Sequence, residues 1–231
     1  MSVIDFHSHI IPKGDHGCNS EQVALRQLKL LFNAGIGTVI ATPHFYPNRH
    51  NVKDFNENIE RRLSSLLTAL PDKRPQIMLG TEVLIFENID RMNGIDDLCI
   101  RGTKIMLLEM PMGNEWSNSL FKTVNKLIEK DITIVLAHID RYLPKHKEDI
   151  KCLLDMGALA QINASSFKKF LFKKHLVPFL NDDRLVAFGT DIHGEDRSAV
   201  ASFADLKKLK NDVFDNIMSK SEKLLKDAVI Y

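Results

Sequence analysis

Short apolar runs of strand length alternate with longer amphipathic stretches along this chain of 231 residues. Near-continuous apolar runs are typical of strands in a parallel sheet that is buried on both faces. The seven runs lie at residues 3–6, 37–42, 76–80, 105–110, 132–137, 158–162 and 185–189. Their alternation with helical stretches predicts right-handed βαβ units and an α/β fold.

The stretches between the runs predict helices, because their apolar residues recur at helical spacing. The expected helices cover 20–34, 56–70, 117–130, 145–156 and 166–177, and the chain after Ser198 is also expected to be helical. Pro178 is expected to end the fifth of these. No linker-like segment divides the chain, so one domain over residues 1–231 is predicted. An α/β barrel is the first interpretation and an open doubly wound sheet the second.

Charge and cysteine content exclude several classes of partner. Lys and Arg number 31 and Asp and Glu 30, a net charge of +1, which gives no reason to expect nucleic acid or a membrane surface. No apolar run is long enough to insert into a bilayer, and no signal peptide is recognisable at the start. The three cysteines show no pairing pattern. A cytoplasmic location is the default expectation.

All but one of the apolar runs end in a side chain that could bind a metal ion. These side chains are His7 with His9, His44, Glu82, Glu109, His138, and Asp191 with His193. The exception is the run at 158–162, which Asn163 follows. The carboxyl ends of barrel strands lie on one face, so we expect these side chains to converge there. The members of each pair are two residues apart and therefore point to the same side of an extended chain.

Imidazole and carboxylate ligands without thiolates suit Mn, Zn or Fe better than a structural zinc site. The ligands are too many for one tetrahedral ion, so a cluster of two or three ions is the simpler interpretation. Such a cluster can make hydroxide from water near neutral pH and can neutralise phosphate oxygens. The residues therefore predict a metal-dependent phosphoesterase.

Taken together, the motifs around these residues resemble the PHP (polymerase and histidinol phosphatase) superfamily. They are DFHSHIIP at 5–12, ATPH at 41–44, GTEV at 80–83, LLEM at 107–110, LAH at 136–138, QINASS at 161–166 and GTDIHG at 189–194. The branch with the greatest similarity is that of bacterial protein-tyrosine phosphatases of the capsule and exopolysaccharide type. The resemblance spans nearly the whole chain.

This resemblance implies a distorted (β/α)7 barrel that holds up to three divalent ions, with Mn²⁺ preferred and Fe, Zn or Mg as alternatives. It implies hydrolysis of phosphotyrosine in a protein, such as a bacterial tyrosine kinase that regulates polysaccharide synthesis. It makes the eight residues named above metal ligands. It assigns Arg141, and less directly Arg197, to catalysis and to binding the substrate phosphate, for which a guanidinium is well shaped. A homo-oligomer is compatible with the sequence.

Two positions depart from the family pattern. Where the family has two successive aspartates before a glycine, this chain has Asp15 and His16, so either is a candidate ligand. An imidazole can bind the same type of ion but brings no negative charge. The family's His-Pro-Glu-Arg is here His-Ile-Asp-Arg, in which Asp140 keeps a carboxylate on a shorter stem. Asp140 and His44 are the candidates for protonating the leaving group.

Three other functions stay open at this point. A small-molecule PHP phosphoesterase, acting on a compound such as histidinol phosphate, would use the same ligands. An amidohydrolase barrel also begins with His-x-His but needs a lysine on a middle strand, where this chain has Glu109. A regulatory binding protein with an impaired metal site is favoured only by His16. A cysteine-type phosphatase is excluded, because Arg26 lies two residues too far from Cys18 to complete Cys-x5-Arg.

Overall fold

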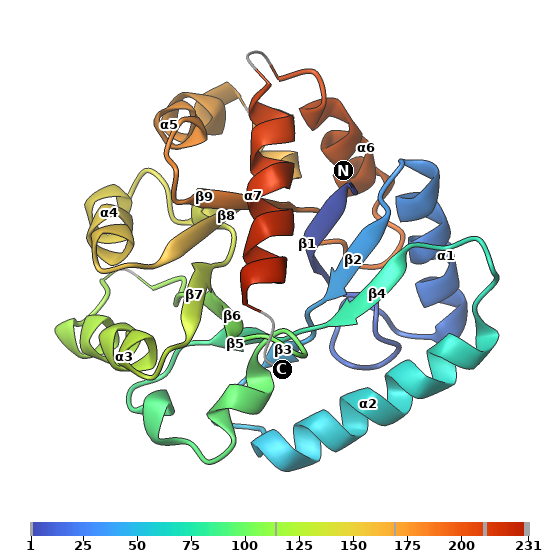
Figure 1. Cartoon of the computed structure of the whole chain (residues 1–231), viewed down its shortest axis with the longest axis horizontal. Coiled ribbons are helices and arrows are strands. Elements are labelled where there is room, and N and C mark those ends of the chain that lie inside the picture. The colour runs from blue at the N-terminus through green and yellow to red at the C-terminus, as the bar shows by residue number, and fades with distance from the viewer. Residues whose placement is uncertain (1, 114, 169, 210–211, 229–231) are drawn as a thin grey trace.

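The computed structural model describes residues 2–113, 115–168, 170–209 and 212–228, with 170–174 as helical backbone only. Its strands pair only in parallel and form two sheets (Figure 1). The first contains β1 (Ile4–Ser8), β2 (Thr38–Ala41) and β4 (Gln76–Leu79). The second contains, in order, β3 (His44–Phe45), β5 (Glu82–Leu84), β6 (Ile105–Glu109), β7 (Thr133–Leu136), β8 (Leu159–Asn163) and β9 (Leu185–Gly189).

Each of the seven apolar runs predicted from the sequence forms a strand, and two of these strands continue after a break. β3 follows β2 across Thr42 and Pro43, and β5 follows β4 across Gly80 and Thr81. A proline has no N–H to donate to a ladder, which suits the first break. Because β2 and β4 pair in one sheet and β3 and β5 in the other, these two bent strands pass from one sheet to the next.

The two sheets are also joined by contacts outside the regular ladders, at β1 with β9 and at β4 with β6. β1 lies beside β9, and beyond the strand ends Asp191 N–H donates to the carbonyl of His7 at 2.8 Å. Between β4 and β6, Arg101 N–H donates to the carbonyl of Leu79 at 2.8 Å, so the turn before β6 fills that position. The strands therefore surround a common axis as an interrupted barrel. The α/β prediction is confirmed, and this curvature favours the barrel over an open sheet.

The helices lie outside the strands, as predicted. They are α1 (Glu21–Asn33), α2 (Val52–Ala69), α3 (Asn118–Glu129), α4 (Lys147–Asp155), α5 (Phe170–Leu180), α6 (Arg197–Leu206) and α7 (Val213–Asp227). Short 3-10 turns, η1 (Ile89–Arg91), η2 (Ile95–Leu98), η3 (Ile139–Arg141) and η4 (Ala164–Lys168), join some of them to the strands. α2 begins four residues earlier than predicted, because Asn51 accepts hydrogen bonds from the first N–H groups.

The prediction that Pro178 ends the fifth helix was wrong. α5 contains Pro178 and continues to Leu180. A proline removes only its own N–H from the helix, and so close to the helix end this loss is small enough for the last turn to form.

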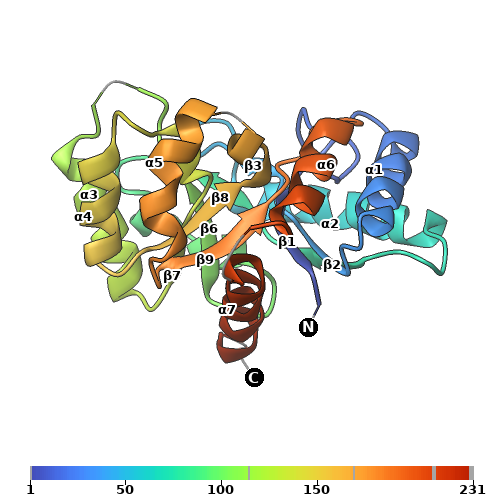
Figure 2. The same ribbon diagram turned by 90° about the horizontal axis from the view of Figure 1, so that it is seen from above.

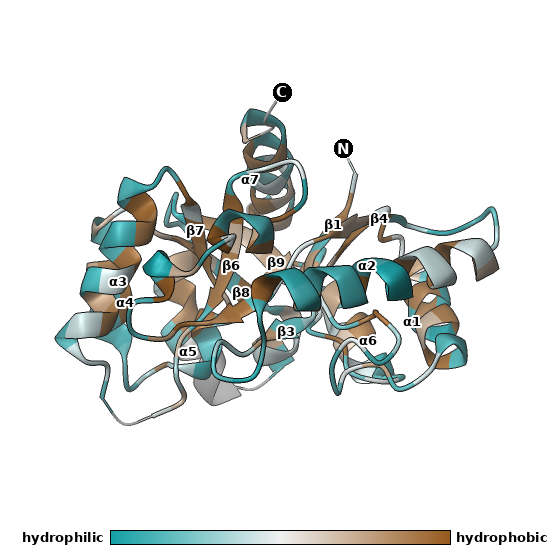
Figure 3. Cartoon of the chain, turned by 90° about the horizontal axis from the view of Figure 1, so that it is seen from below, coloured by the Kyte–Doolittle hydropathy of each residue, from teal (hydrophilic) through white to brown (hydrophobic). Residues whose placement is uncertain are grey.

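The interior of the barrel is apolar at its amino end. The buried residues there form one cluster that includes Phe6, Ile40, Leu107, Val135 and Leu225. Leu225 belongs to α7, the last helix of the chain. This helix lies across the start of β1 and β9 (Figure 2). A larger cluster fills the space between the strands and the outer helices, whose polar faces point outward (Figure 3). The opposite, carboxyl end of the barrel carries the polar residues that follow the strands.

A buried carboxylate holds β1 and β9 together close to that end. Asp5 accepts hydrogen bonds from Thr190 N–H at 2.8 Å and from the Thr190 hydroxyl at 2.6 Å. Burial raises the pKa of Asp5 to about 6, in spite of these bonds. Thr190 directly precedes Asp191, so this contact also fixes the position of Asp191.

We predict that Thr190→Val lowers the free energy of unfolding by about 1–3 kcal/mol, since it leaves a buried carboxylate oxygen without its hydroxyl donor. The ionised carboxylate needs the donor most, so the loss should be larger at about pH 8 than at about pH 5. Urea unfolding at the two pH values, with a chelator present, measures the loss and its pH dependence. Thr133→Val, at a half-buried position of β7, is the control. Equal losses in the two variants would contradict the role of the Asp5 contact.

Candidate metal centre

Three imidazole nitrogens converge on one carboxylate oxygen at the carboxyl end of the barrel. His7 Nε2, His9 Nε2 and His44 Nδ1 lie 3.1, 3.2 and 2.9 Å from Oε2 of Glu82. The four side chains come from β1, the residue after β1, β3 and β5. The pairing of β3 with β5 sets His44 directly beside Glu82. The breaks after β2 and β4 thus bring these two residues into the cluster.

His138 and Glu109 extend the cluster along the sheet. His138 Nε2 lies 2.8 Å from the other oxygen of Glu82 and 3.8 Å from Oε1 of Glu109. Oε2 of Glu109 lies 3.8 Å from His44 Nδ1. His138 lies two residues beyond the end of β7 and has a φ of 32°. This left-handed conformation is uncommon for residues other than glycine. It lets the chain turn sharply into η3 as the ring points inward.

Asp191 and His193 complete the cluster from the end of β9. Oδ1 of Asp191 lies 3.3 Å from His9 Nε2 and 3.4 Å from His193 Nδ1. The rings of His9 and His193 have centroids 4.2 Å apart. Asp191, like His138, has a positive φ, of 51°. All eight side chains predicted at the strand ends therefore lie in one group.

The donor atoms fit divalent cations. Glu82 Oε2 and His44 Nδ1 are buried and have no hydrogen-bond partner, although they face each other. Unpartnered buried lone pairs are unfavourable unless something positive lies among them. Three sets of residues each place their ligand atoms within 4.8 Å of one another: His9, His44 and His193; His7, His9 and Glu82; and His44, Glu82 and Glu109. The overlap of these sets suits a cluster of ions bound by nitrogen and oxygen.

The charges of the cluster favour a cation as well. Burial opposes ionisation of Glu82, but the neighbouring rings, His7 foremost, outweigh it and hold the pKa of Glu82 well below its usual value. Burial and the charge of Glu82 both raise the pKa of Glu109. Burial and the charge of His9 lower the pKa of His193 to about 4, so His193 is neutral near pH 7. A cation would relieve the repulsion between the two glutamates.

Asp15 and His16 occupy different positions at this site. Oδ2 of Asp15 lies 2.6 Å from His9 Nδ1 and accepts a hydrogen bond from the backbone of His44, and Oδ1 accepts one from Gly17 N–H. Both oxygens therefore bind the protein rather than face the cluster. The exposed ring of His16 stacks on that of His44, with centroids 5.0 Å apart, and lies 4.7 Å from that of His193. His16 thus lies over the mouth of the site.

The predicted catalytic residues also differ in their surroundings. Arg141, at the end of η3, pairs with Oδ2 of Asp191 while 40% of its side chain is exposed. Arg197 is an exposed residue that begins α6. Asp140 is buried, and its two oxygens accept hydrogen bonds from Asn163 N–H at 2.8 Å and the Ser166 hydroxyl at 2.6 Å. Arg141 thus faces the cluster, whereas the carboxylate of Asp140 is directed at β8 and η4.

Two polar residues beside the cluster were not assigned a role from the sequence. Gln161 and Asn163, in β8, are buried and hydrogen-bonded to His7 and Asp191 respectively. The available signal was a glutamine inside an apolar run, two residues before the asparagine that ends it. That spacing puts both amides on the same face of the strand.

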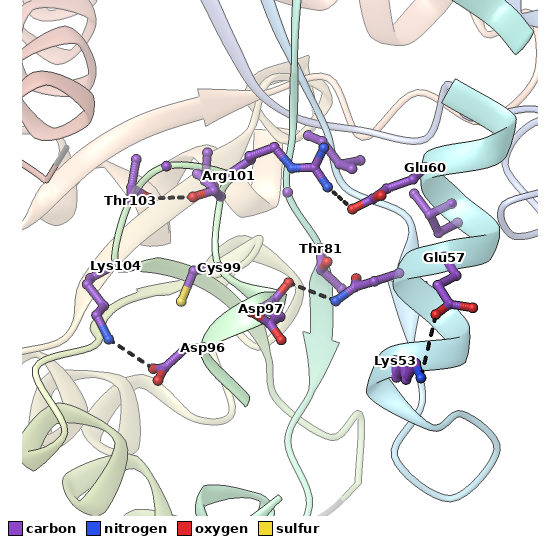
Figure 4. A pocket seen from close by; sticks show the side chains of 16 residues that line it. Lys53, Glu57, Glu60, Thr81, Asp96, Asp97, Cys99, Arg101, Thr103 and Lys104 are labelled. Carbon is purple, nitrogen blue, oxygen red and sulfur yellow. Dashed lines mark hydrogen bonds and ion pairs between the residues drawn. The ribbon is translucent and has the colours of Figure 1, made fainter. Parts of the chain in front are cut away.

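A separate cavity of about 500 Å³ lies between α2, η2 and the turn before β6 (Figure 4). None of the metal-ligand candidates lines it. Its cations are matched by carboxylates: Lys53 pairs with Glu57, Arg101 with Glu60, and Lys104 with Asp96 (Figure 4). This balance gives the cavity no preference for an anion such as phosphate.

A parallel α/β barrel with a His and carboxylate cluster at the carboxyl ends of its strands defines the class of this chain: a PHP-like barrel with a candidate metal centre. The model of the family described as "Capsular polysaccharide synthesis, CpsB/CapC" matches residues 3–224. The chain therefore belongs to the CpsB/CapC family.

Relatives and solved structures agree with this assignment. The tyrosine-protein phosphatase CpsB of Streptococcus agalactiae is 26% identical over 208 residues, covering 84% of each chain, and that of Streptococcus pneumoniae is 23% identical over 207 residues, with the same coverage. A structure from work on YwqE of Bacillus subtilis and CpsB of S. pneumoniae, metal-dependent tyrosine phosphatases, superposes with a TM-score of 0.78 at 19% identity, covering 99% of this chain and 96% of that one. A Mycobacterium tuberculosis phosphotriesterase shares the fold, with a TM-score of 0.57 at 10% identity over 100% and 95% of the chains.

Each helix of the described residues is too short or too polar to cross a bilayer.

The surroundings of Cys18 and Cys99 argue against a thiolate nucleophile at either residue. Cys18 is buried near the site, where its thiol donates to the carbonyl of Ser20, and burial raises its pKa to about 11. Burial raises the pKa of Cys99 to about 12. Cys152 is exposed. Only a thiolate is a strong nucleophile, so Cys18 is inert at neutral pH.

We predict that an aromatic disulfide reagent at neutral pH modifies Cys152 quickly in the native protein and Cys18 and Cys99 only after unfolding. The physical reason is that two of the thiols are buried and neutral. Absorbance of the released thiolate counts the reactive groups, and Cys152→Ser should abolish the fast phase. A fast phase that remains in Cys152→Ser and disappears in Cys18→Ser would contradict this description of Cys18.

Proposed function

We propose that this chain is a metal-dependent protein-tyrosine phosphatase that hydrolyses phosphotyrosine in a protein substrate. The convergence of His7, His9 and His44 on Glu82 is the observation that carries the proposal. Membership of the CpsB/CapC family, and the names of its relatives, give the phosphatase activity and the link to capsular polysaccharide synthesis. The proposed substrate is a tyrosine kinase of that system, and the proposed compartment is the cytoplasm, where the three free cysteines would stay reduced.

The eight strand-end residues would hold two or three divalent ions, for which we propose Mn²⁺. Ions held there would lower the pKa of bound water and neutralise phosphate oxygens. His9, His44 and Glu82 each belong to two of the three sets of converging atoms, so these residues would hold neighbouring ions. The apolar interior behind the cluster excludes water from the other side.

Arg141 is the residue we propose to bind the phosphate. Its guanidinium lies at the open side of the cluster and has the fork geometry that suits two phosphate oxygens. Tyr46 follows β3, and its partly exposed ring stacks on His44 with centroids 5.2 Å apart. We propose that this ring lines the path of the aromatic substrate. Arg197 is proposed as a second phosphate-binding group because it begins α6 shortly after His193 in the chain.

The departing tyrosine oxygen has a pKa of about 10, so its release needs little acid assistance. Asp140 is buried and uses both oxygens to hold Asn163 and Ser166. We therefore propose that Asp140 stabilises the loop that carries Arg141 rather than transferring a proton. Its place two residues after His138 suits this role.

A small-molecule phosphatase is the second candidate, because the same cluster would serve a compound such as histidinol phosphate. Faster turnover of histidinol phosphate than of a phosphotyrosine peptide would favour it. An amidohydrolase is less compatible with the site, since β6 ends in Glu109 where that class needs a lysine.

We predict that His7→Ala abolishes Mn²⁺-dependent hydrolysis of para-nitrophenyl phosphate and of a phosphotyrosine peptide. The substitution removes one of the three imidazole nitrogens that converge on Glu82. Rates with and without added Mn²⁺, together with metal content, measure this. His175→Ala, on α5, is the control and should retain wild-type turnover. A fully active His7→Ala would overturn the proposal.

We predict that Arg141→Ala lowers kcat/KM for the phosphotyrosine peptide by about 100-fold, the usual size of a lost electrostatic contact to a developing charge. Arg141→Lys should recover only part, because an ammonium lacks the guanidinium fork. Arg184→Ala is the control, since Arg184 pairs with Asp155 and Asp182 at the amino end of β9. Unchanged kcat/KM in Arg141→Ala, with normal Mn²⁺ content, would remove Arg141 from the site.

A further inference from the structure

The apolar run that forms β8 is the one of the seven that no proposed ligand follows, yet the polar residues of β8 lie against the cluster. Gln161 and Asn163 are 0% and 4% exposed. They are two residues apart in the strand, so both amides point to the same side. Burying an amide is unfavourable unless its donor and acceptor atoms all have partners. The partners of these two side chains therefore indicate what β8 contributes.

One backbone group sets the direction of the hydrogen bonds. The N–H of His138 donates to Oε1 of Gln161 at 2.6 Å. A backbone N–H can only donate, so the Gln161 atom that faces it must be the oxygen. Nε2 of Gln161 is then the atom that donates to Oδ1 of Asn163 at 2.9 Å. This leaves Nδ2 of Asn163 to donate to Oδ2 of Asp191 at 2.8 Å.

The same oxygen of Gln161 determines which nitrogen of His7 carries a proton. Oε1 of Gln161 lies 3.3 Å from His7 Nδ1. An amide oxygen cannot donate, so Nδ1 must carry the hydrogen whether the ring is neutral or charged. In the neutral ring Nε2 is then the nitrogen whose lone pair is available for a metal ion, and it is the one that faces Glu82 at 3.1 Å.

Asn163 makes a similar selection at Asp191. Oδ2 of Asp191 accepts from Asn163 and pairs with Arg141, whereas Oδ1 faces His9 and His193. One oxygen is thus held by the protein and the other is left for the cluster. A carboxylate bound in this way cannot rotate to exchange its oxygens without breaking both outer contacts.

The packing leaves no room for a different arrangement. A Cβ added at Gly189, at the end of β9, would lie 2.6 Å from the Cβ of His7 and 2.7 Å from Nε2 of Gln161. Contacts this short do not occur, so the absence of a side chain at 189 is what lets His7 and Gln161 meet. The glycine and the two amides therefore form one closely packed unit behind the ligands.

We propose that Gln161 and Asn163 form a directional hydrogen-bond relay that prepares His7 and Asp191 for metal binding: Gln161 fixes the His7 tautomer and Asn163 fixes the Asp191 carboxylate. The proposal rests on the metal centre proposed above. Both amides are positioning residues, because they act through the ligands and lie behind them. Partners of this kind usually change metal affinity by about 10- to 100-fold.

The first test measures Mn²⁺ binding by titration calorimetry in wild type, Gln161→Met and Asn163→Leu. Both variants keep the side-chain volume and remove the hydrogen bonds, so we expect a Kd about 10- to 100-fold higher in each. Because the two amides are hydrogen-bonded to each other, the double variant should raise the Kd by less than the product of the two single increases. Ser221→Ala is the control, since it removes a buried hydroxyl that donates to the carbonyl of Val186 in β9, away from the ligands. It should lower the melting temperature and leave the Kd unchanged.

The second test reads the His7 tautomer directly, first in the wild type and then in Gln161→Met. Long-range ¹H–¹⁵N spectra of histidine-labelled protein, loaded with diamagnetic Zn²⁺, should show His7 with its proton on Nδ1 and with Nε2 bound to the metal. In Gln161→Met the Nδ1 proton should exchange faster with water, because its acceptor is gone.

The outcomes separate this relay from the proposed function. A His7 proton on Nε2 in wild type, or an unchanged Mn²⁺ Kd in folded Gln161→Met, would overturn the relay and leave the metal centre in place. A wild-type protein that does not bind Mn²⁺ would overturn the metal centre and the relay with it. If Gln161→Met does not fold, Asn163→Leu and the wild-type spectrum decide.

Discussion

The carboxylate of Glu82 is buried among the rings of His7, His9, His44 and His138, and the arrangement of the barrel follows from this contact. Taking a carboxylate out of water costs several kcal/mol unless opposite charge or hydrogen bonds compensate it. The strands provide that compensation from several directions at once. β1, β3, β5 and β7 must all end at one level for their side chains to reach Glu82. The two bent strands, which change sheets just before His44 and Glu82, meet this requirement.

A large part of this arrangement could be predicted from the sequence, because its physical signals are local. Apolar runs such as 105–110 and 132–137 indicate strands buried on both faces, and polar residues at their ends mark the edge of the barrel where ligands gather. His7 and His9 were predicted to face one side because the period of a strand is two. All eight strand-end residues lie together because the carboxyl ends of parallel barrel strands share one face, although whether they bind metal stays a prediction.

Other features depend on contacts between distant residues, which no local pattern contains. The sequence does not show that Asp15 would turn toward His9, because that contact depends on how the loop after β1 folds back. Pro178 was expected to end a helix, but α5 continues past it for two residues, to Leu180. The breaks after β2 and β4 were not predicted either, since each consists of only two residues and leaves the apolar pattern almost unchanged. The role of Gln161 depends on a backbone N–H that is 23 residues away.

The position of α7 limits where a substrate can enter the barrel and where a product can leave it. Leu225 and the apolar side chains around it close the amino end, whereas the exposed residues beside the cluster, His16 and Arg141, lie at its carboxyl side. A substrate that reaches Glu82 would therefore have to enter and leave at the carboxyl end of the barrel. In the proposed reaction, the phosphate product would have to leave by the route through which the next substrate enters. Because that route passes Arg141, the group proposed to bind phosphate, product release would limit how fast the cycle can repeat.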